Sequence, residues 1–296
     1  MSNGRVSIVF STYNSSEYIE RCLESCLNQD YGDLFIIIAD DGSTDDTIKK
    51  IEEKCGTCDN FRLIPLPHGE RGIARSTAIA EAKKLKSDYI YIIDSDMVLK
   101  DNLISECIDF LGENKTVGAL VIPEIAFSDY NNFYSKVKVF ERNVINDAGE
   151  DIGSNSVEAA RFWKMEAYDA SGGINVHQIS FEETQPTIRY IENGGIIKRA
   201  IFTGVYHDEK EVTLKNIVKK KRYYFSVMNT TIETEQGGAK KAFSRWFFFR
   251  PVLYRKENLK KYVKHPVLTL GMIYMYLVLT LVGIEEILKA KIRGKK

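Results

Sequence analysis

The chain has 296 residues, of which 44% are hydrophobic and 28% are charged, and its formal net charge at pH 7 is zero. This hydrophobic content can build a large buried core, which excludes an intrinsically disordered chain. Five cysteines are too few for a disulfide scaffold. The length fits about two domains of roughly 150 residues, or one α/β domain with a C-terminal tail.

The zero net charge hides an uneven distribution of charge. Residues 1–214 carry 22 Lys and Arg against 36 Asp and Glu, whereas residues 215–264 carry 14 against 3. Because the basic excess is confined to one stretch, a protein that binds nucleic acid along its whole length is not expected. We expect an acidic body joined to a basic segment.

Five short runs rich in β-branched residues lie in the first 123 residues, with helical patterns between them. This alternation predicts βαβ units and a mainly parallel central sheet in an α/β fold. The predicted strands are 6–10, 35–39, 61–64, 89–93 and 118–122, and the predicted helices are 17–29, 45–54, 72–86 and 102–113.

The helix starts carry capping signals, and the pattern loosens after residue 123. The second helix opens with Ser43-Thr-Asp-Asp46, which has the spacing of a capping box, and Asp101 is a plausible cap for the fourth helix. Asn, Asp and Gly are scattered through residues 128–156, so we expect loops and acceptor-side structure there.

Polar clusters follow three of the predicted strands, at the edge where open parallel sheets bind their ligands. They are Ser11 to Asn14, Asp40 to Asp45, and Asp94 to Asp96. Helix capping accounts for Asp45 and Asp46 but explains little about Asp94 and Asp96. Two carboxylates two positions apart at a strand end can converge on a hard cation such as Mg²⁺ or Mn²⁺.

With these motifs in view, the sequence resembles the family 2 glycosyltransferases, which have the GT-A nucleotide-sugar-binding fold. The resemblance is close over residues 5 to about 105 and loose over 155–210. Ser11 stands where the family usually has proline, and Ser76 stands where asparagine is common. The matching stretches are Val6 to Asn14, Tyr18 to Gln29, Ile36 to Thr47 with its Asp-Asp-Gly-Ser turn, Gly72 to Arg75, and Tyr89 to Asp96.

The resemblance implies a nucleotide site and a metal site. Thr12, Tyr13 and Asp41 would hold the base and ribose. A basic residue that opens the third helix would help, and Arg71 and Arg75 both fit, although either could be a solvated surface charge. Asp96 would bind the Mn²⁺ or Mg²⁺ that bridges the diphosphate, with Asp94 nearer the ribose.

The resemblance also implies an acceptor half. Gly172 and Gly173 match its Gly-Gly turn, and the family has Glu-Asp several residues later, where the Asp deprotonates the acceptor hydroxyl. Here Glu182 and Glu183 follow, so Glu183 would be the base, unless both are exposed charges at a helix start. His207 falls where related enzymes place a histidine near the metal, although a lone histidine can equally be a hydrogen-bonded structural residue.

Cysteine spacing leaves a second metal hypothesis open. Cys22 and Cys26 lie one helical turn apart, and Cys55 and Cys58 form a Cys-x-x-Cys pair. Four thiolates could hold zinc. The first pair falls on positions that the resembled family fills with core residues, which favours a core role.

The C-terminal region carries signals of membrane contact. Residues 266–284 have no formal charge and would span about 28 Å as a helix, which is just enough to cross a bilayer. A buried core helix and a helix lying in the interface are the alternatives. Both flanks are basic, so the positive-inside rule gives no orientation. Aromatic and basic residues are mixed in 219–225 and 245–250. Such a mixture suits binding either to a lipid interface or to single-stranded nucleic acid. The adjoining apolar run favours lipid.

Together with these patterns, the resemblance implies a metal-dependent inverting glycosyltransferase of the cell membrane. Its catalytic domain is expected in the cytoplasm, since the N-terminus lacks a signal peptide. It would move a sugar from a UDP- or GDP-linked donor to a lipid-linked saccharide hydroxyl, without a nucleic-acid partner. The expected parts are a catalytic domain, 1–214, with a nucleotide half to about 123 and an acceptor half from 124. A membrane-proximal segment, 215–264, and a hydrophobic helix with a basic tail, 265–296, would follow.

Three other functions compete with this one. A polyprenyl-phosphate acceptor is already ionised and would need no base. A non-catalytic membrane scaffold that binds nucleotide sugars would leave the Glu pair without a role. A sugar-phosphate nucleotidyltransferase would need a glycine-rich loop after the first strand, and residues 11–14 contain no glycine.

Overall fold

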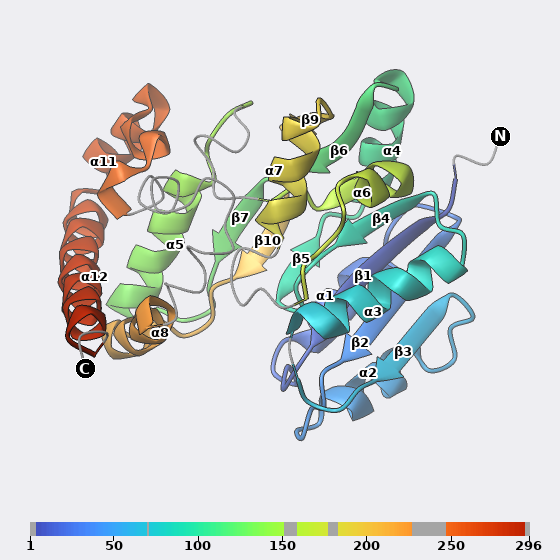
Figure 1. Ribbon diagram of the computed structural model, residues 1–296, viewed down its shortest axis with the longest axis horizontal. Helices are drawn as coiled ribbons and strands as arrows, with labels where there is room; N and C mark the ends of the chain where they lie inside the picture. The colour runs from blue at the N-terminus through green and yellow to red at the C-terminus, as the bar shows by residue number, and fades with distance from the viewer. Residues whose placement is uncertain (1–3, 70, 151–158, 177–182, 227–246, 294–296) are drawn as a thin grey trace. The chain divides into compact units, whose positions relative to one another are not determined.

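The computed structural model describes residues 4–69, 71–150, 159–176, 183–226 and 247–293 (Figure 1). The chain folds into two compact units. The first contains mainly the residues up to Glu124 and residues 159–207, and the second contains mainly residues 125–148 and those from Asp208 onward. The chain passes from the first unit to the second within β7 (Glu124–Phe127), and it does so again within β10 (Val205–Asp208).

The first unit is built on a seven-stranded sheet in the order β3-β2-β1-β4-β8-β6-β9. All its neighbouring strands are parallel except β8, which is antiparallel to both β4 and β6. The predicted mainly parallel α/β sheet is therefore confirmed. The strands are β1 (Val6–Thr12), β2 (Leu34–Asp40), β3 (Phe61–Pro65), β4 (Tyr89–Ile92), β6 (Val117–Val121), β8 (Phe162–Lys164) and β9 (Ile196–Arg199).

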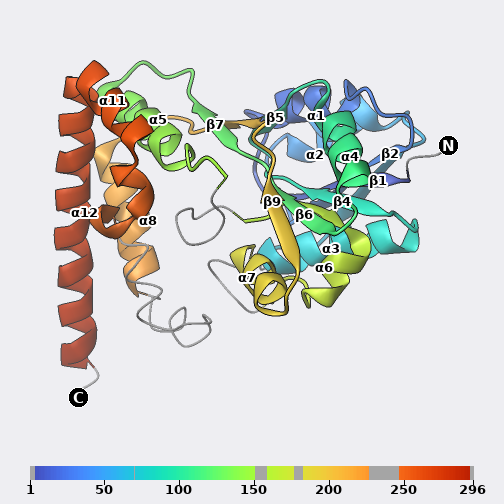
Figure 2. The ribbon, with the colours of Figure 1, turned by 90° about the horizontal axis from the view of Figure 1, so that it is seen from above.

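Helices cover both faces of this sheet, which is why β1 is buried along its whole length and the central strands are mostly apolar. Along β1, Ile8 and Phe10 join one core cluster and Val9 joins the other, as the two-residue period of a strand requires. The first cluster includes residues of α1 (Ile19–Leu27), α2 (Thr47–Cys55) and α4 (Leu103–Glu113). The second includes residues of α3 (Arg71–Lys84) and α6 (Met165–Ala170), on the opposite face (Figure 2).

A short antiparallel pair brings a late part of the chain to the edge of the sheet. In the pair of β5 (Met97–Leu99) and β10, His207 lies opposite Met97. The helix α7 (Thr184–Glu192) precedes β9. This pairing carries His207 to the residues that directly follow β4.

All the predicted strands and helices of the first 123 residues are present with shifted ends, but two capping predictions are wrong. The Ser43 hydroxyl donates to Asp40 at 2.5 Å, and α2 begins at Thr47, whose backbone N–H donates to Asp45 at 3.0 Å. Asn102, and not Asp101, precedes α4, without a side-chain capping bond.

The second unit is helical and has its own core. Its α5 (Phe133–Ile145) lies where we expected loops, and the Asn132 side chain caps it by accepting from the Ser135 backbone at 2.9 Å. The apolar run 266–284 is part of a longer helix, α12 (Pro266–Arg293). The other helices are α8 (Leu214–Ser226), the 3₁₀ turns η1 (Phe247–Phe249) and η2 (Pro251–Tyr254), and α11 (Lys256–Lys264).

Candidate active site

Three of the predicted nucleotide-site residues lie together at the carboxyl ends of β1 and β2. The register pairs Thr12 with Asp40, and the backbone N–H of Asp41 donates to the Thr12 carbonyl at 2.8 Å. The Thr12 hydroxyl is buried and makes no hydrogen bond within the described residues. Tyr13 is 44% exposed. A free hydroxyl and an accessible ring at one strand end suit a ligand with both polar groups and an aromatic base.

His68 joins this group, although we did not predict it. Its ring stacks on Tyr13 with centroids 4.2 Å apart and planes 16° from parallel. Its Nδ1 lies 3.2 Å from the Asp41 carboxylate, which also accepts from the Gly69 backbone at 2.9 Å. His68 follows β3 at the same edge of the sheet, so the strand-end rule that selected the other clusters could have found it.

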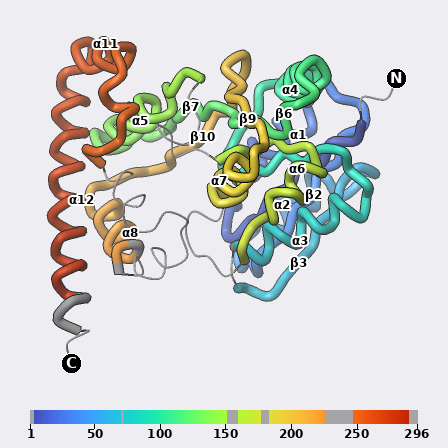
Figure 3. The backbone as a smooth tube through the Cα atoms, turned by 45° about the horizontal axis from the view of Figure 1, so that its top comes forward, coloured from blue at the N-terminus to red at the C-terminus, as the bar shows by residue number. Residues whose placement is uncertain are grey.

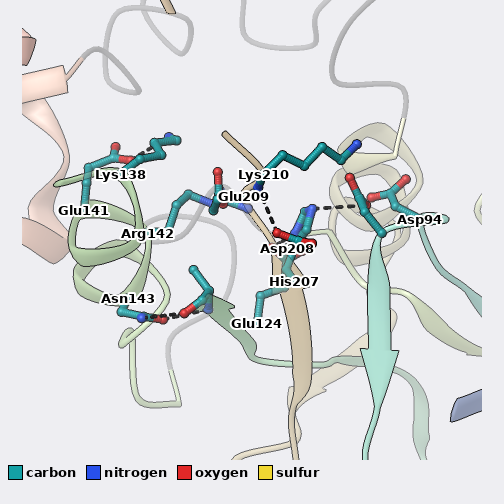
Figure 4. A network of polar contacts seen from close by, with 12 residues as sticks. Asp94, Glu124, Lys138, Glu141, Arg142, Asn143, His207, Asp208, Glu209 and Lys210 are labelled. Carbon is teal, nitrogen blue, oxygen red and sulfur yellow. Dashed lines mark hydrogen bonds and ion pairs between the residues drawn. The ribbon is translucent and has the colours of Figure 1, made fainter. Parts of the chain in front are cut away.

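Asp94, Asp96 and His207 form the one group in the described part of the chain with the ligand spacing of a metal site. One ligand atom from each lies within 4.8 Å of the other two. His207 Nε2 is 3.4 Å from Asp96 Oδ1. On its other side, His207 Nδ1 is 2.9 Å from Oε2 of Glu124, and Figure 4 labels both of these residues. Carboxylate and imidazole ligands suit Mn²⁺, and a ligating histidine is commonly oriented by a carboxylate on its other nitrogen. The residues present therefore fit the implied divalent cation.

The charge state of His207 is set by its neighbours. Burial acts to lower its pKa, but the Glu124 and Asp96 carboxylates outweigh this and raise it to about 10. Without a metal the imidazole is therefore protonated at neutral pH. A cation held by Asp96 and His207 would need neutral Nε2, so metal binding would release a proton.

This pKa predicts how stability depends on pH without metal. The pKa of His207 is about 10 in the folded chain and about 6.5 in the unfolded chain. The stability that protonated His207 gives the folded state is therefore complete below pH 6.5 and is lost as pH rises toward 10. The contribution should fall by about 1.4 kcal/mol per pH unit in this window. Urea unfolding in EDTA at pH 7 and pH 9 tests this, with His207→Gln as the control. If both proteins lose the same stability, His207 does not titrate as described.

Arg75 is a buried cation and not a solvated surface charge. It lies one turn into α3 and is 1% exposed. Its Nη2 is 2.5 Å from Asp94 Oδ1, and its Nη1 contacts the Glu183 carboxylate. Arg75 thus connects the predicted metal site with the predicted base. Arg71 is the first residue of α3.

Arg161 provides a second connection that sequence reasoning missed. Its Nη2 lies 2.9 Å from Asp94, 3.0 Å from Glu183 and 3.6 Å from Glu124. The guanidinium is buried, and charge-assisted contacts of this kind are directional and strong in such surroundings. Because Glu124 in turn contacts His207, Arg161 links the carboxylate behind the histidine to the predicted base.

Glu183 is not an exposed charge at a helix start. It directly precedes α7 without making a side-chain cap, and its side chain is 17% exposed between the two arginines. Glu182 lies outside the described residues. The Gly172-Gly173 turn has positive φ at both residues, 76° and 63°, which favours glycine. Arg189 holds this turn by donating to the carbonyls of Ser171 and Gly173.

The cysteines belong to the core. Cys22, Cys26 and Cys55 are buried in the first core cluster. Burial raises the pKa of Cys55 to about 11, which disfavours the thiolate that zinc requires. Within the described residues the four cysteines form no group with metal-ligand spacing.

Known proteins with similar sequences include bacterial polysaccharide synthases. Chondroitin synthase of Escherichia coli is 26% identical over 232 residues, which cover 77% of this chain and 32% of that protein. Hyaluronan synthase of Pasteurella multocida is 35% identical over 115 residues, which cover 39% of this chain and 12% of that protein. The chain therefore spans a third or less of the length of these relatives.

Solved structures share the fold at low sequence identity. S. aureus TarS 1–349 in complex with UDP-GlcNAc superposes with a TM-score of 0.57 at 15% identity, over 95% of this chain and 89% of that chain. The mannosyltransferase PcManGT from Pyrobaculum calidifontis, in complex with GDP-Man and Mn²⁺, gives 0.53 at 17%, over 94% of this chain and 74% of that chain. These similarities agree with the expected GT-A fold.

The family assignment rests on the sequence itself. The profile of the family described as Glycosyl transferase family 2 matches residues 7–169, which is more than half of the chain. This match covers β1 to α6, including the ends of β1, β2 and β4. The predicted resemblance is confirmed, and the chain belongs to glycosyl transferase family 2.

Proposed function

We propose that this protein is a metal-dependent inverting glycosyltransferase that transfers a sugar from a nucleotide-sugar donor to a hydroxyl of a lipid-linked saccharide. The observation that carries the proposal is the placement of Asp94, Asp96 and His207 beside the Arg75–Glu183 ion pair, in a family 2 chain. The cluster and the ion pair meet at Asp94, so donor and base would lie in one site.

The donor is proposed from the fold and from the residues at the strand ends. The similar structures carry UDP-GlcNAc and GDP-Man, the latter with Mn²⁺. In this chain, Tyr13 and His68 offer stacked rings for a base, and Asp41 and Thr12 offer polar groups for the base and ribose. Arg71 and Arg75 remain the proposed basic residues of this site.

The diphosphate is proposed to lie beside Asp96. When bound there, Mn²⁺ or Mg²⁺ would neutralise the charge that develops on the departing nucleoside diphosphate. Asp96 and His207 would hold the cation, and Asp94 would lie nearer the ribose. Glu124 would keep the His207 ring oriented through its Nδ1.

Glu183 is the proposed general base. Its ion pairs with two guanidinium groups require a carboxylate, which is the form that accepts a proton. Removing the proton of the acceptor hydroxyl would let that oxygen attack the anomeric carbon from the side opposite the diphosphate. A single displacement of this kind inverts the anomeric configuration. Gly172 and Gly173 would shape the acceptor side.

One observation favours the second candidate, a polyprenyl-phosphate acceptor. The Glu183 carboxylate is shared by Arg75 and Arg161, so it could serve only to hold these two residues in place. A phosphate acceptor is ionised before it binds and would need no base.

The membrane location also belongs to the proposal. The relatives include a teichoic acid biosynthesis protein and a poly(ribitol-phosphate) N-acetylglucosaminyltransferase, whose names point to cell-envelope polymers. We propose that residues 1–214 act on the cytoplasmic face of the cell membrane. The segments 215–264 and 265–296 would attach them to it.

Product analysis tests the transfer reaction. The full chain should convert an α-linked UDP- or GDP-sugar and a detergent-solubilised lipid-linked saccharide to a β-glycoside, which proton NMR coupling at the anomeric carbon identifies. Retention of configuration would contradict the single displacement. Transfer to a polyprenyl phosphate with no transfer to the saccharide would favour the second candidate.

A further inference from the structure

The helix α12 has two faces of different exposure. One face is buried and contains Met272, Met275, Tyr276 and Leu279, which join the core of the second unit, and Val282, which is 8% exposed. At 100° per residue, the exposed residues fall on the opposite side. We call this side the uncovered face, and it consists of Val267, Leu270, Ile273, Tyr274, Leu277, Leu281, Ile284 and Leu288, which are 38–67% exposed.

The buried face is held by neighbouring helices along most of its length. Near the start of α12, a Cβ on Gly271 would clash with Phe133 and Val137 of α5. At the middle, the Tyr276 hydroxyl donates to Glu141 of α5 at 2.8 Å. Toward the end, Arg222 of α8 pairs with Glu285 at 2.8 Å. Figures 2 and 3 agree that α5 and α8 lie along one side of α12.

These neighbours carry charges that a membrane-spanning arrangement would place inside the bilayer. Glu141 is 3% exposed and pairs with Lys138 at 2.7 Å (Figure 4) and with Arg250 at 3.5 Å. Burial acts to raise the pKa of Glu141, yet Lys138 and Arg250 bring it to about 2, so this ion cluster stays charged. It lies beside Tyr276, near the middle of α12. Charged groups at the bilayer centre are strongly disfavoured, so a span would require α12 to leave its neighbours.

Basic residues stand next to apolar ones on the preceding helix. Lys256, Lys260 and Lys264 recur every fourth residue of α11 and are exposed. Leu259 and Val263 of α11 are 49% and 83% exposed. Lysines beside an exposed apolar surface complement the anionic headgroups and acyl chains of a lipid surface.

We propose that α11 and α12 form an anchor that lies in the plane of an anionic membrane, with the uncovered face among the lipid chains and without crossing the bilayer. Within the described residues α12 is the one helix long and apolar enough to cross a membrane. By length and composition alone, α12 could cross a bilayer. The charged neighbours packed along its buried face argue against such a crossing. The inference rests on the proposed membrane attachment and specifies its form.

Depth measurements on the full chain test this form of attachment. Single cysteines at Leu270, Leu277 and Ile284, introduced in a Cys58→Ser background, would carry a fluorophore on vesicles of phosphatidylcholine with phosphatidylglycerol. The other four native cysteines are buried. Lipids that carry a quencher near the headgroup should quench the fluorophore equally at all three positions. They should quench it more strongly than lipids that carry the quencher at the end of the acyl chain. Asp59→Cys, at an exposed position outside α11 and α12, is the control and should be quenched least.

A graded depth, with Leu277 deepest, would overturn the in-plane arrangement while leaving membrane attachment intact. Absence of vesicle binding would overturn attachment itself. If the protein instead forms a concentration-dependent dimer in sedimentation and binds no vesicles, the uncovered face belongs to a second copy of the chain. Donor binding measured on the same samples keeps these outcomes separate from the proposed transfer reaction.

Two sets of substitutions separate the contributions of apolar and of charged side chains to vesicle binding. Leu270→Gln, Leu277→Gln and Leu281→Gln together should abolish vesicle binding without unfolding the chain, because these side chains are exposed. Lys256→Gln, Lys260→Gln and Lys264→Gln together should weaken binding to anionic vesicles about 100-fold and leave binding to neutral vesicles unchanged. Equal losses on both kinds of vesicle would contradict the role of the lysines.

Discussion

Replacing Asp96 with alanine is expected to abolish metal-dependent binding of the nucleotide sugar while the chain stays folded. Asp96 is one of the two residues proposed to hold the cation, and its loss leaves His207 alone, with Asp94 beside it. Without the cation, the diphosphate would face Asp94 and Glu183 with less compensating charge. Isothermal titration calorimetry with Mn²⁺ and the preferred donor should show no binding for Asp96→Ala at donor concentrations that saturate the original protein.

The control for this experiment is Asp59→Ala. Asp59 is exposed between α2 and β3 and lies outside the site. The Asp59→Ala variant should bind donor and metal as the original chain does. Both variants should show the circular dichroism spectrum of the folded protein. Unchanged donor affinity in Asp96→Ala would contradict the assignment of Asp96 to the metal site.

Glu183→Gln is expected to keep donor affinity and to lower turnover by about 100-fold or more, which is the usual scale of a lost general base. The amide keeps the size of the side chain and cannot accept the acceptor proton. It also removes the charge that pairs with Arg75 and Arg161, so unfolding must be measured beside turnover. A rate of transfer that falls while donor affinity and melting temperature hold would assign Glu183 to the chemical step.

Glu182→Gln is the matched control, because it changes the same group one position earlier. If it proves more damaging than Glu183→Gln, the base is Glu182. If neither substitution slows transfer, the acceptor is a phosphate that needs no base.

The sheet and its carboxyl edge could be predicted because they depend on local patterns. The runs that became β1, β2 and β4 are apolar over several residues since helices cover both faces of the sheet. Parallel strands bring their carboxyl ends to one edge, so Asp41 and Asp94 could be placed there together. His207 could be assigned only through the family resemblance, because β10 pairs with a strand more than a hundred residues earlier.

The arginine contacts could not be predicted, because they depend on an irregular strand order. β8 lies between β4 and β6 and is antiparallel to both. This insertion brings Arg161, directly before β8, to Asp94, two residues after β4. The charge of each residue is visible in the sequence, but which carboxylate it faces is decided by this pairing.

The C-terminal region shows a different limit of sequence reasoning. Residues 266–284 are apolar on every side, so their periodicity does not reveal which side is covered. The division into a buried and an uncovered face follows from contacts with α5, which lies more than a hundred residues earlier. In α5 itself, Phe133, Val137, Phe140 and Val144 have helical spacing, and the surrounding Asn and Asp residues obscured it.

Thermal unfolding with a panel of UDP- and GDP-sugars tests the central claim, a metal-dependent nucleotide-sugar site, most directly. The full chain would be melted with each donor in Mn²⁺ and again in EDTA. We expect at least one donor to raise the melting temperature in Mn²⁺ and EDTA to remove the increase, because ligands that bind only the folded state stabilise it by mass action. Equal stabilisation with and without metal, or none with any donor, would contradict it.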